Sequence, residues 1–211
     1  VGLHKRGYRQ NSTEAPIKET LAAAMVKLAR VRSDGHFIDP FCGSGTLLTE
    51  AALYALGIAP GLQRRFSAEK WGQVDSKVWR DATFQAEGYD IDPAAVALSL
   101  ENAKKAGVIA RVKARVQDIR DFRPEGEYGC VICNPPYGER LLDIQSAQEL
   151  YRVMGKVFVP QHGWSYSIIS PDETCEDCYG RRADKRRKLY NGMIKCQYYQ
   201  YFTYPRKGKT E

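Results

Sequence analysis

The chain has 211 residues, which suits one α/β domain with a full hydrophobic core. No segment approaches the roughly 18 consecutive apolar residues of a membrane-spanning helix, and no apolar segment follows the first basic residues as in a signal peptide. We therefore expect a cytoplasmic protein with no membrane partner, and the net charge of +7 fits either an RNA or DNA partner or a merely basic domain.

The first half of the chain alternates between helical and strand-like patterns. The segment over residues 1–30 includes an amphipathic helix from Ala15 to Arg30. A short strand at Phe37–Ile38 leads into a glycine-bearing turn, and Leu47–Leu56 is predicted to be helical. Residues 57–84 show no clear period and are predicted to be an insertion.

The middle of the chain continues this alternation. Asp92 fits the cap of a helix with Pro93 at its first position. A later helix carries apolar residues at helical spacing between Leu150 and Phe158. Four strand-like runs are predicted around these helices, at Gln85–Ile91, Arg111–Val116, Tyr128–Cys133 and Ser165–Ile169.

Two turn signals organise the last part of the chain. Ser170–Glu173 is predicted to be a capping box with Pro171 at the first helical position. Asn191-Gly192, between β-type runs at Arg187–Tyr190 and Met193–Tyr204, predicts a hairpin. The alternation of strands and helices predicts an α/β fold with a parallel, doubly wound sheet, to which the hairpin adds an antiparallel strand.

A turn with the sequence Asp-Pro-Phe-Cys-Gly-Ser-Gly-Thr spans Asp39–Thr46, between a strand and a helix. Parallel sheets bind nucleotide-like ligands at such turns, and glycines let a ligand approach the backbone. The spacing is not GxGxxG, which disfavours a dinucleotide, and it is not a P-loop. An acid before the glycines suits the cationic amino group of S-adenosylmethionine, although a tight turn with an acidic cap would give the same pattern.

Acidic residues also follow the next two strands. Asp90 is placed to accept hydrogen bonds from ribose hydroxyls, whereas Asp92 is better explained as a helix cap. Asp118 could accept a hydrogen bond from an adenine amino group beside the Ile119 N–H, or could be an ordinary loop residue. The residues that we expect to bind the donor are Asp39, Pro40, Phe41, Cys42, Gly43, Ser44, Gly45, Asp90, Ile91, Asp118 and Ile119.

Asn134-Pro135-Pro136-Tyr137 directly follows an apolar strand. The exocyclic nitrogen of a base is a poor nucleophile, because its lone pair is delocalised into the ring. The Asn134 side-chain oxygen and the Pro135 carbonyl can each accept one of its N–H bonds and turn the lone pair towards the methyl donor. Pro135 and Pro136 stiffen the loop, and Tyr137 offers a face for a flipped-out base. These four residues are therefore our catalytic candidates, for an in-line transfer that needs no covalent enzyme intermediate.

Taken in order, these motifs resemble the class I methyltransferases of the THUMP-associated RNA methylase family, which includes bacterial large-subunit rRNA guanine-N2 methyltransferases. The resemblance covers nearly the whole chain, and its marks are His4–Arg9, Ala15–Ala24, Asp39–Thr46, Asp90–Pro93 and Asn134–Arg140. It implies a Rossmann-like, seven-stranded sheet with an antiparallel last strand. It also implies S-adenosylmethionine as donor and guanine N2 of RNA, such as rRNA, as acceptor.

Members of that family carry an RNA-binding THUMP domain before this region. The chain begins at Val1, within what reads as the interior of a motif. We therefore expect residues 1–211 to be a methyltransferase domain separated from an upstream THUMP domain, with weakened RNA binding and an intact donor site.

Three basic features could also meet RNA. Arg64–Trp79 mixes basic and aromatic residues, and Arg181–Lys188 is rich in Lys and Arg, although both would also fit a solvated surface. Arg140 could hold the catalytic loop or touch phosphate.

No metal is expected. Cys175 and Cys178 form half of a zinc pattern, which only Cys196 and His162 could complete.

Other functions fit the motifs less well. Asn-Pro-Pro-Tyr also serves enzymes that methylate adenine N6 or protein glutamine, and this motif alone does not separate them. Cytosine-C5 methylation would require a Cys nucleophile in the loop, but Cys133 precedes Asn134 on the strand side. A non-catalytic RNA-binding module would not need the acids and Asn134, and a nicotinamide-dependent oxidoreductase lacks its glycine signature.

Overall fold

The computed structural model describes residues 5–9, 17–59, 83–137 and 144–203. One sheet contains seven strands in the order β3-β2-β1-β4-β5-β7-β6. Their bounds are β1 (His36–Asp39), β2 (Gln85–Asp90), β3 (Val112–Val116), β4 (Gly129–Cys133), β5 (Trp164–Ser170), β6 (Lys185–Asn191) and β7 (Ile194–Phe202). Neighbours from β3 to β5 are parallel, whereas β7 is antiparallel to both β5 and β6. This confirms the predicted doubly wound α/β sheet with an antiparallel last strand.

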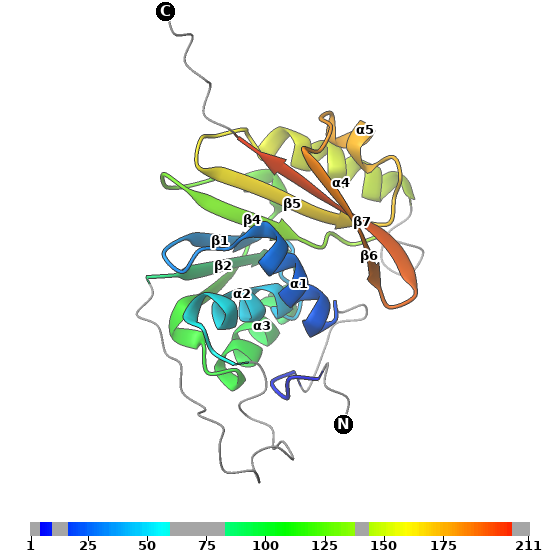
Figure 1. Cartoon of the computed structure of the whole chain (residues 1–211). Coiled ribbons are helices and arrows are strands. Elements are labelled where there is room, and N and C mark those ends of the chain that lie inside the picture. Colours follow the sequence, from blue (N-terminus) through cyan, green and yellow to red (C-terminus); the bar gives the residue numbers. More distant parts are fainter. Residues whose placement is uncertain (1–4, 10–16, 60–82, 138–143, 204–211) are drawn as a thin grey trace, which may run out of the picture.

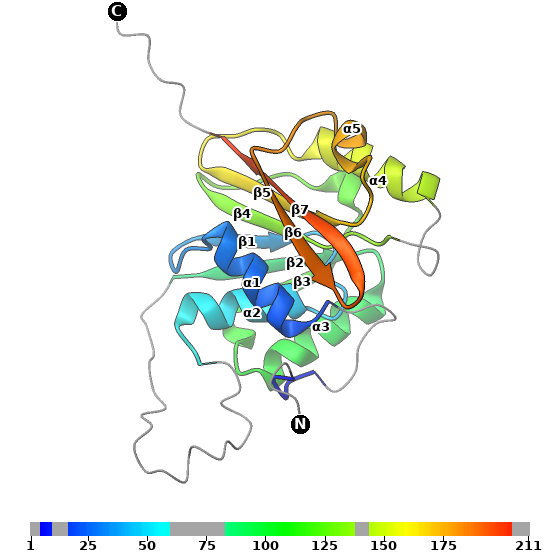
Figure 2. The same cartoon turned by 45° about the vertical axis from the view of Figure 1, so that its right-hand side comes forward.

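Helices cover both faces of the sheet (Figures 1 and 2). One face carries α1 (Glu19–Ala29), α2 (Thr46–Leu56) and α3 (Pro93–Lys105), and the other carries α4 (Ile144–Val157) and α5 (Cys175–Tyr179). Because side chains alternate along a strand, Phe37 of β1 joins the core under α1 and α2, while Ile38 joins the core under α4. Two apolar layers therefore hold the central strands.

Local capping explains the start of α3. Asp92 Oδ1 accepts a hydrogen bond from the Ala94 N–H at 2.8 Å, and Pro93 occupies the first turn. This confirms the predicted cap and proline. α1 begins at Glu19, later than the predicted Ala15, after an extended Lys18 that provides no side-chain cap.

The capping box predicted at Ser170–Glu173 is wrong, because α5 begins only at Cys175. Ser170 Oγ lies 2.8 Å from the Tyr151 hydroxyl of α4 and accepts the Asp172 N–H at 3.0 Å. Asp172 in turn accepts the Thr174 N–H at 2.8 Å. A hydrogen-bonded turn therefore separates β5 from α5, and Pro171 lies in it rather than in a helix.

The amino-terminal segment packs against the helix that follows the glycine turn. Tyr8 is buried, and its hydroxyl donates to Glu50 of α2 at 3.0 Å. Arg6 pairs with the same carboxylate at 3.4 Å, and Arg9 pairs with Glu19 at 3.1 Å. The part of the His4–Arg9 motif that is described thus holds α1 and α2 together at the start of the domain.

The structure also bears on the predicted insertion at residues 57–84 and on membrane-spanning helices. α2 ends at Leu56, and most of the predicted insertion, residues 60–82, lies outside the described residues. In the described part of the chain, no helix is long and apolar enough to cross a membrane.

Candidate active site

The predicted site residues follow four neighbouring strands, β3, β2, β1 and β4. The chain runs outward from β1 to β3 and then returns to β4, so the strand order reverses between β1 and β4. Open α/β sheets bind ligands at the carboxyl ends of strands beside such a switch point. The register places Asp39 beside Gly88 and Ile38 beside Val131, so the loops after these strands leave from the same edge. The fold therefore brings the ends of these four strands together.

α3 holds the glycine turn through two polar side chains. Ser99 Oγ donates to the Gly43 carbonyl at 2.9 Å, and Asn102 Nδ2 donates to the Ser44 carbonyl at 2.9 Å. Both residues are fully buried. The sequence analysis did not identify these two residues. The available signal was a pair of polar residues, three apart, among the apolar positions of an amphipathic helix.

Gly45 allows the turn to lie directly against α3. Its φ is 74°, in the left-handed region that favours glycine. A Cβ at this position would lie 2.8 Å from Ser99 Oγ and 2.9 Å from Ser99 Cα. The backbone of the turn is therefore fixed both by conformation and by close packing.

Asp90 joins the glycine turn to the end of β2. Its Oδ2 accepts the Gly43 N–H at 2.9 Å, and its Oδ1 accepts the Asp92 N–H at 3.0 Å. A carboxylate has about four acceptor sites, so both oxygens retain a lone pair for further donors. Ile91, the next residue, is a large apolar side chain that is 71% exposed.

Asp39 lies at the end of β1 and is buried. The pKa of this carboxyl is raised to about 8, mainly by burial; a hydrogen bond from the Phe41 N–H opposes the shift, and the nearby Asp90 charge adds to it. That bond to Asp39 Oδ1 is 3.1 Å long. A cationic amino group bound beside Asp39 would favour its ionised form and lower the pKa.

The loop after β3 forms a short 3₁₀ helix, η3 (Ile119–Asp121). Asp118 caps it by accepting the Arg120 N–H at 2.8 Å and pairs with the Arg120 guanidinium at 2.9 Å. The Ile119 side chain is buried under α4, and its N–H stands at the first helical position, where no partner within the helix exists. The structure thus shows a capping role for Asp118, and its contact with an adenine stays a prediction.

The loop after β4 carries the four catalytic candidates. Asn134 Oδ1 is buried and has no hydrogen-bond partner among the described residues. Such acceptors are rare in folded proteins, and each calls for an explanation. Pro135 is buried, whereas Pro136 is partly exposed. The prolines therefore fix the loop, and an unsatisfied oxygen is available at its start.

Tyr137 ends the described part of this loop and contacts the β6–β7 hairpin. Its hydroxyl accepts a hydrogen bond from Asn191 Nδ2 at 2.9 Å and lies 4.0 Å from Cys196 Sγ. Burial raises the pKa of Tyr137 to about 12, so the phenol is neutral near pH 7. The contact with Asn191 was not predicted, because the Asn-Gly signal indicated only a turn.

The cysteines are free thiols. Cys133 is fully buried, and burial raises its pKa well above the ordinary value, so it is unsuited to act as a nucleophile. Burial likewise raises the pKa of Cys42 to about 12. Over residues 5–9, 17–59, 83–137 and 144–203, no group of three or more His, Cys, Asp or Glu side chains could hold a metal ion. The half zinc pattern of Cys175 and Cys178 is therefore not completed by Cys196 and His162.

Arg140 and the basic and aromatic segment Arg64–Trp79 lie outside the described residues.

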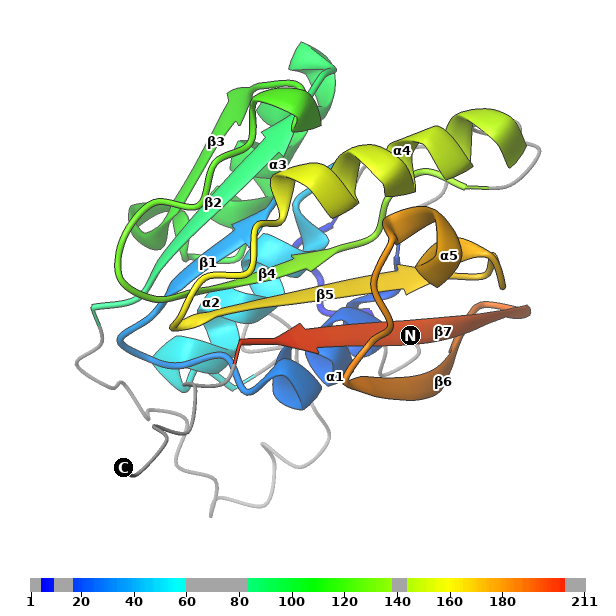
Figure 3. The same ribbon diagram turned by 90° about the horizontal axis from the view of Figure 1, so that it is seen from above.

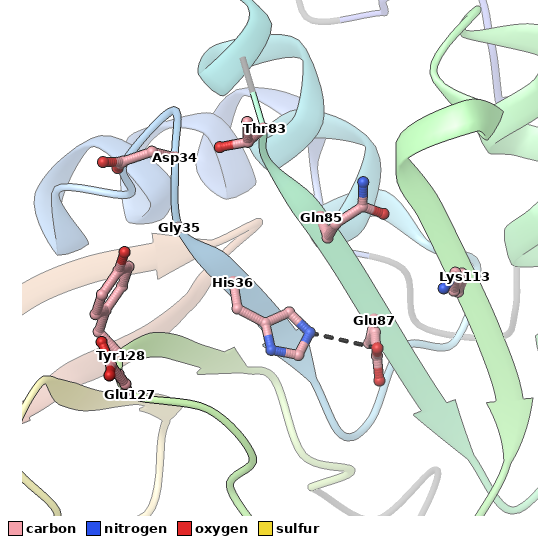
Figure 4. A pocket seen from close by; sticks show the side chains of 9 residues that line it. All are labelled: Asp34, Gly35, His36, Thr83, Gln85, Glu87, Lys113, Glu127 and Tyr128. Atoms are coloured by element: carbon pink, nitrogen blue, oxygen red, sulfur yellow. Dashed lines mark ion pairs between the residues drawn. The ribbon is translucent and has the colours of Figure 1, made fainter.

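A hollow of about 430 Å³ lies at the opposite edge of the sheet, near the amino ends of β1 and β2 (Figure 4). His36 Nε2 lies 3.4 Å from Glu87 Oε1 there, and Gln85 and Lys113 complete a polar lining. None of the predicted site residues lines it. The hollow is therefore separate from the site at the carboxyl ends of the strands.

The model of a family described as "RMKL-like, methyltransferase domain" matches residues 6–200. RNA methyltransferase YpsC of Bacillus subtilis (strain 168) is 42% identical over 100% of this chain and 58% of its own length. The ribosomal RNA large subunit methyltransferase K/L of Shewanella baltica (strain OS195) is 40% identical over 93% of this chain and 30% of its own length. The chain thus spans little more than half of the first relative and less than a third of the second.

Two solved structures are closely similar to this chain in both fold and sequence. The crystal structure of the methyltransferase SMU.472 in complex with SAH has a TM-score of 0.86 at 41% identity, over 96% of this chain and 56% of that chain. A Listeria monocytogenes protein, described as "a predicted N6-adenine-specific DNA methylase", has a TM-score of 0.82 at 42% identity, over 97% of this chain and 56% of that chain. The fold is that of the class I methyltransferases.

Proposed function

Because the chain belongs to the family of RMKL-like methyltransferase domains, we propose that it transfers a methyl group from S-adenosylmethionine to an exocyclic amino group of RNA. The observation that carries this proposal is the buried Asn134 Oδ1, which has no partner among the described residues. An amino group of a base supplies the N–H donor that this oxygen lacks.

The donor site of the proposal consists of the turn Asp39–Gly45 with Asp90, Ile91, Asp118 and Ile119. SAH, the product form of the donor, is bound in the SMU.472 structure, a relative with 41% identity. In this chain the remaining lone pairs of the Asp90 carboxylate accept hydrogen bonds from the ribose hydroxyls. The exposed Ile91 side chain gives an apolar surface for the adenine. Buried Asp39 accepts the cationic amino group, a pairing that stabilises its ionised form.

The catalytic step of the proposal depends on the Asn134–Tyr137 loop. Asn134 Oδ1 and the Pro135 carbonyl accept the two N–H bonds of the amino group, so its lone pair turns towards the sulfonium methyl. The Tyr137 ring stacks on the flipped-out base. The buried Cys133 thiol takes no part, since its raised pKa keeps it protonated. Catalysis thus rests on positioning and fixed dipoles rather than on a covalent intermediate.

Guanine N2 of large-subunit ribosomal RNA is the acceptor that we propose. A K/L relative at 40% identity is named as a large-subunit ribosomal RNA methyltransferase, and the net charge of +7 suits RNA. The name of the Listeria relative instead supports adenine N6 as a second candidate. The same proposal includes a THUMP domain in the remainder of the protein. It also includes a cytoplasmic location, where ribosomes are assembled.

Nucleoside analysis separates these acceptors. The chain is incubated with unmodified large-subunit ribosomal RNA, transcribed in vitro, and with methyl-labelled S-adenosylmethionine, and the RNA is then digested to nucleosides. Labelled N2-methylguanosine is expected, and Asn134→Ala serves as the inactive control. N6-methyladenosine would move the assignment to the second candidate. If the chain failed to bind S-adenosylmethionine by calorimetry, the donor site itself would be wrong.

A further inference from the structure

The β6–β7 hairpin extends past the carboxyl edge of the sheet. β5 ends at Ser170, which pairs with Gln197 of β7. Residues Ile194–Cys196 pair with β6 and, among the described strands, with no other. We name the segment Leu189–Cys196 the hairpin tip. Figures 1 and 3 show it beyond the end of β5, on the side where the catalytic loop leaves β4.

The hairpin tip contacts the catalytic loop directly. Asn191 donates to the Tyr137 hydroxyl at 2.9 Å, and Cys196, from the other strand of the tip, lies 4.0 Å from the same oxygen. The tip therefore holds the residue whose ring is proposed to stack on the target base. A polynucleotide whose base enters this site must pass close to the tip.

The surface of the hairpin tip combines exposed and half-exposed apolar and aromatic side chains. Met193 is 96% exposed, and Tyr190 and Ile194 are about half exposed. Lys188 Nζ lies 5.4 Å from the centre of the Tyr190 ring, a cation–π arrangement. Exposed apolar groups clustered at one place usually mark a binding surface.

The charge of the hairpin indicates the kind of partner. Residues 185–202 contain five Lys or Arg and no Asp or Glu, and these five are Lys185, Arg186, Arg187, Lys188 and Lys195. Arg186 is paired with Glu176 of α5, so a part of this charge is neutralised within the domain. A symmetric dimer through this surface would set like charges against each other. Basic residues interleaved with aromatic faces instead suit a single-stranded nucleic acid.

We propose that the hairpin tip is an RNA-docking surface that flanks the target nucleotide. Lys195 of the tip and Lys188, the residue just before the tip, contact phosphates of the strand. Tyr190 and Met193 pack against the bases next to the one that is flipped out. The inference rests on the proposed function, and it adds the surface by which this domain itself, apart from any other domain, grips its substrate.

Two substitutions test the surface. Met193→Glu is expected to weaken binding of unmodified large-subunit ribosomal RNA at least roughly five-fold, because it removes an apolar base contact and adds a negative charge. Lys195→Gln is expected to lower the slope of log affinity against log salt by about 1. Ile109→Glu and Lys104→Gln are the matched controls, since both residues are exposed near the amino edge of the sheet. The affinity for S-adenosylmethionine should stay unchanged in all four variants.

Three outcomes would overturn the inference. Wild-type RNA affinity in both Met193→Glu and Lys195→Gln would show that the tip does not touch RNA. A wild-type chain that dimerises in sedimentation, and loses the dimer on Met193→Glu, would assign the tip to contacts between copies. If the control variants lost as much RNA affinity as the tip variants, the effect would come from the overall surface charge and not from the tip. If the wild-type chain methylates no RNA at all, the proposed function itself fails, and this result differs from each of the three outcomes above.

Discussion

Gly43 donates its backbone N–H to Asp90 Oδ2 at 2.9 Å, although 47 residues separate the two in the sequence. The other oxygen of the same carboxylate accepts the N–H of Asp92, the cap of α3. One side chain thus fixes the glycine turn and the end of β2 in relation to each other, and the geometry of the proposed donor site depends on it.

Replacing Asp90 by Ala should weaken donor binding. The change removes the proposed hydroxyl acceptor and releases the Gly43 N–H, and a hydrogen bond to a charged group contributes about 1.5–3 kcal/mol, so a loss of roughly 10- to 100-fold in affinity is expected. Titration calorimetry with S-adenosylhomocysteine measures it. Asp92→Ala is the control, because it removes only the bond to Ala94 and should cost about 1 kcal/mol of stability. Equal donor affinities in the two variants would contradict the assignment.

Asn134→Ala should separate catalysis from binding. We expect methyl transfer to fall roughly 100- to 1,000-fold, as on loss of one fixed polar group in an active site, with the dissociation constant of the donor unchanged. Stability should not fall through a lost bond to Oδ1, since that oxygen has no partner among the described residues. Single-turnover kinetics on a verified RNA substrate gives the transfer rate, titration calorimetry gives the dissociation constant of the donor, and a urea unfolding curve gives the stability. Full activity in this variant would refute the proposed mechanism.

Gly45→Ala should destabilise the domain more than Gly107→Ala. Both glycines have positive φ, 74° and 76°, so an alanine pays a similar backbone cost of about 1–2 kcal/mol at each. Only at position 45 would the new Cβ also press on Ser99, whereas nothing lies within 4 Å at position 107. Urea unfolding compares the two, and donor binding should fall in Gly45→Ala alone. Identical unfolding curves would show that the turn can move away from α3.

The stability of the domain should fall with rising pH because of Asp39. Its pKa is raised from 3.8 to about 8 by burial, so the folded state keeps a proton that the unfolded chain releases. The stabilising effect of that proton is complete below about pH 4 and is lost as pH rises through about 8.

Asp39→Asn removes this titration and retains an oxygen for the Phe41 N–H. The free energy of unfolding of wild type should therefore fall from pH 5 to pH 9 by more than that of the variant. Urea unfolding of both proteins at the two pH values measures this difference. The variant should also bind the donor more weakly at pH 9, where wild-type Asp39 is ionised. Parallel pH profiles for the two proteins would show that Asp39 does not titrate in this range.

Local signals in the sequence predicted much of the fold. The cap at Asp92 and the turn at Asn191-Gly192 both hold, because each depends on residues adjacent in the chain. The capping box at Ser170 failed although its pattern was equally local. Its hydroxyl instead meets Tyr151, which lies 19 residues away, and that competition does not appear in a four-residue motif.

The sequence by itself determined the class of sheet and the order in which Asp39, Asp90, Asp118 and Asn134 follow successive strands, because hydrophobic periodicity and turn residues act over short distances. The tertiary structure alone decided the protonation of Asp39 and the contact between Tyr137 and Asn191, which are 54 residues apart. Burial and long-range contact arise only when the sheet assembles. A local sequence pattern therefore predicts which polar residues form this site, whereas packing determines their protonation and their contacts.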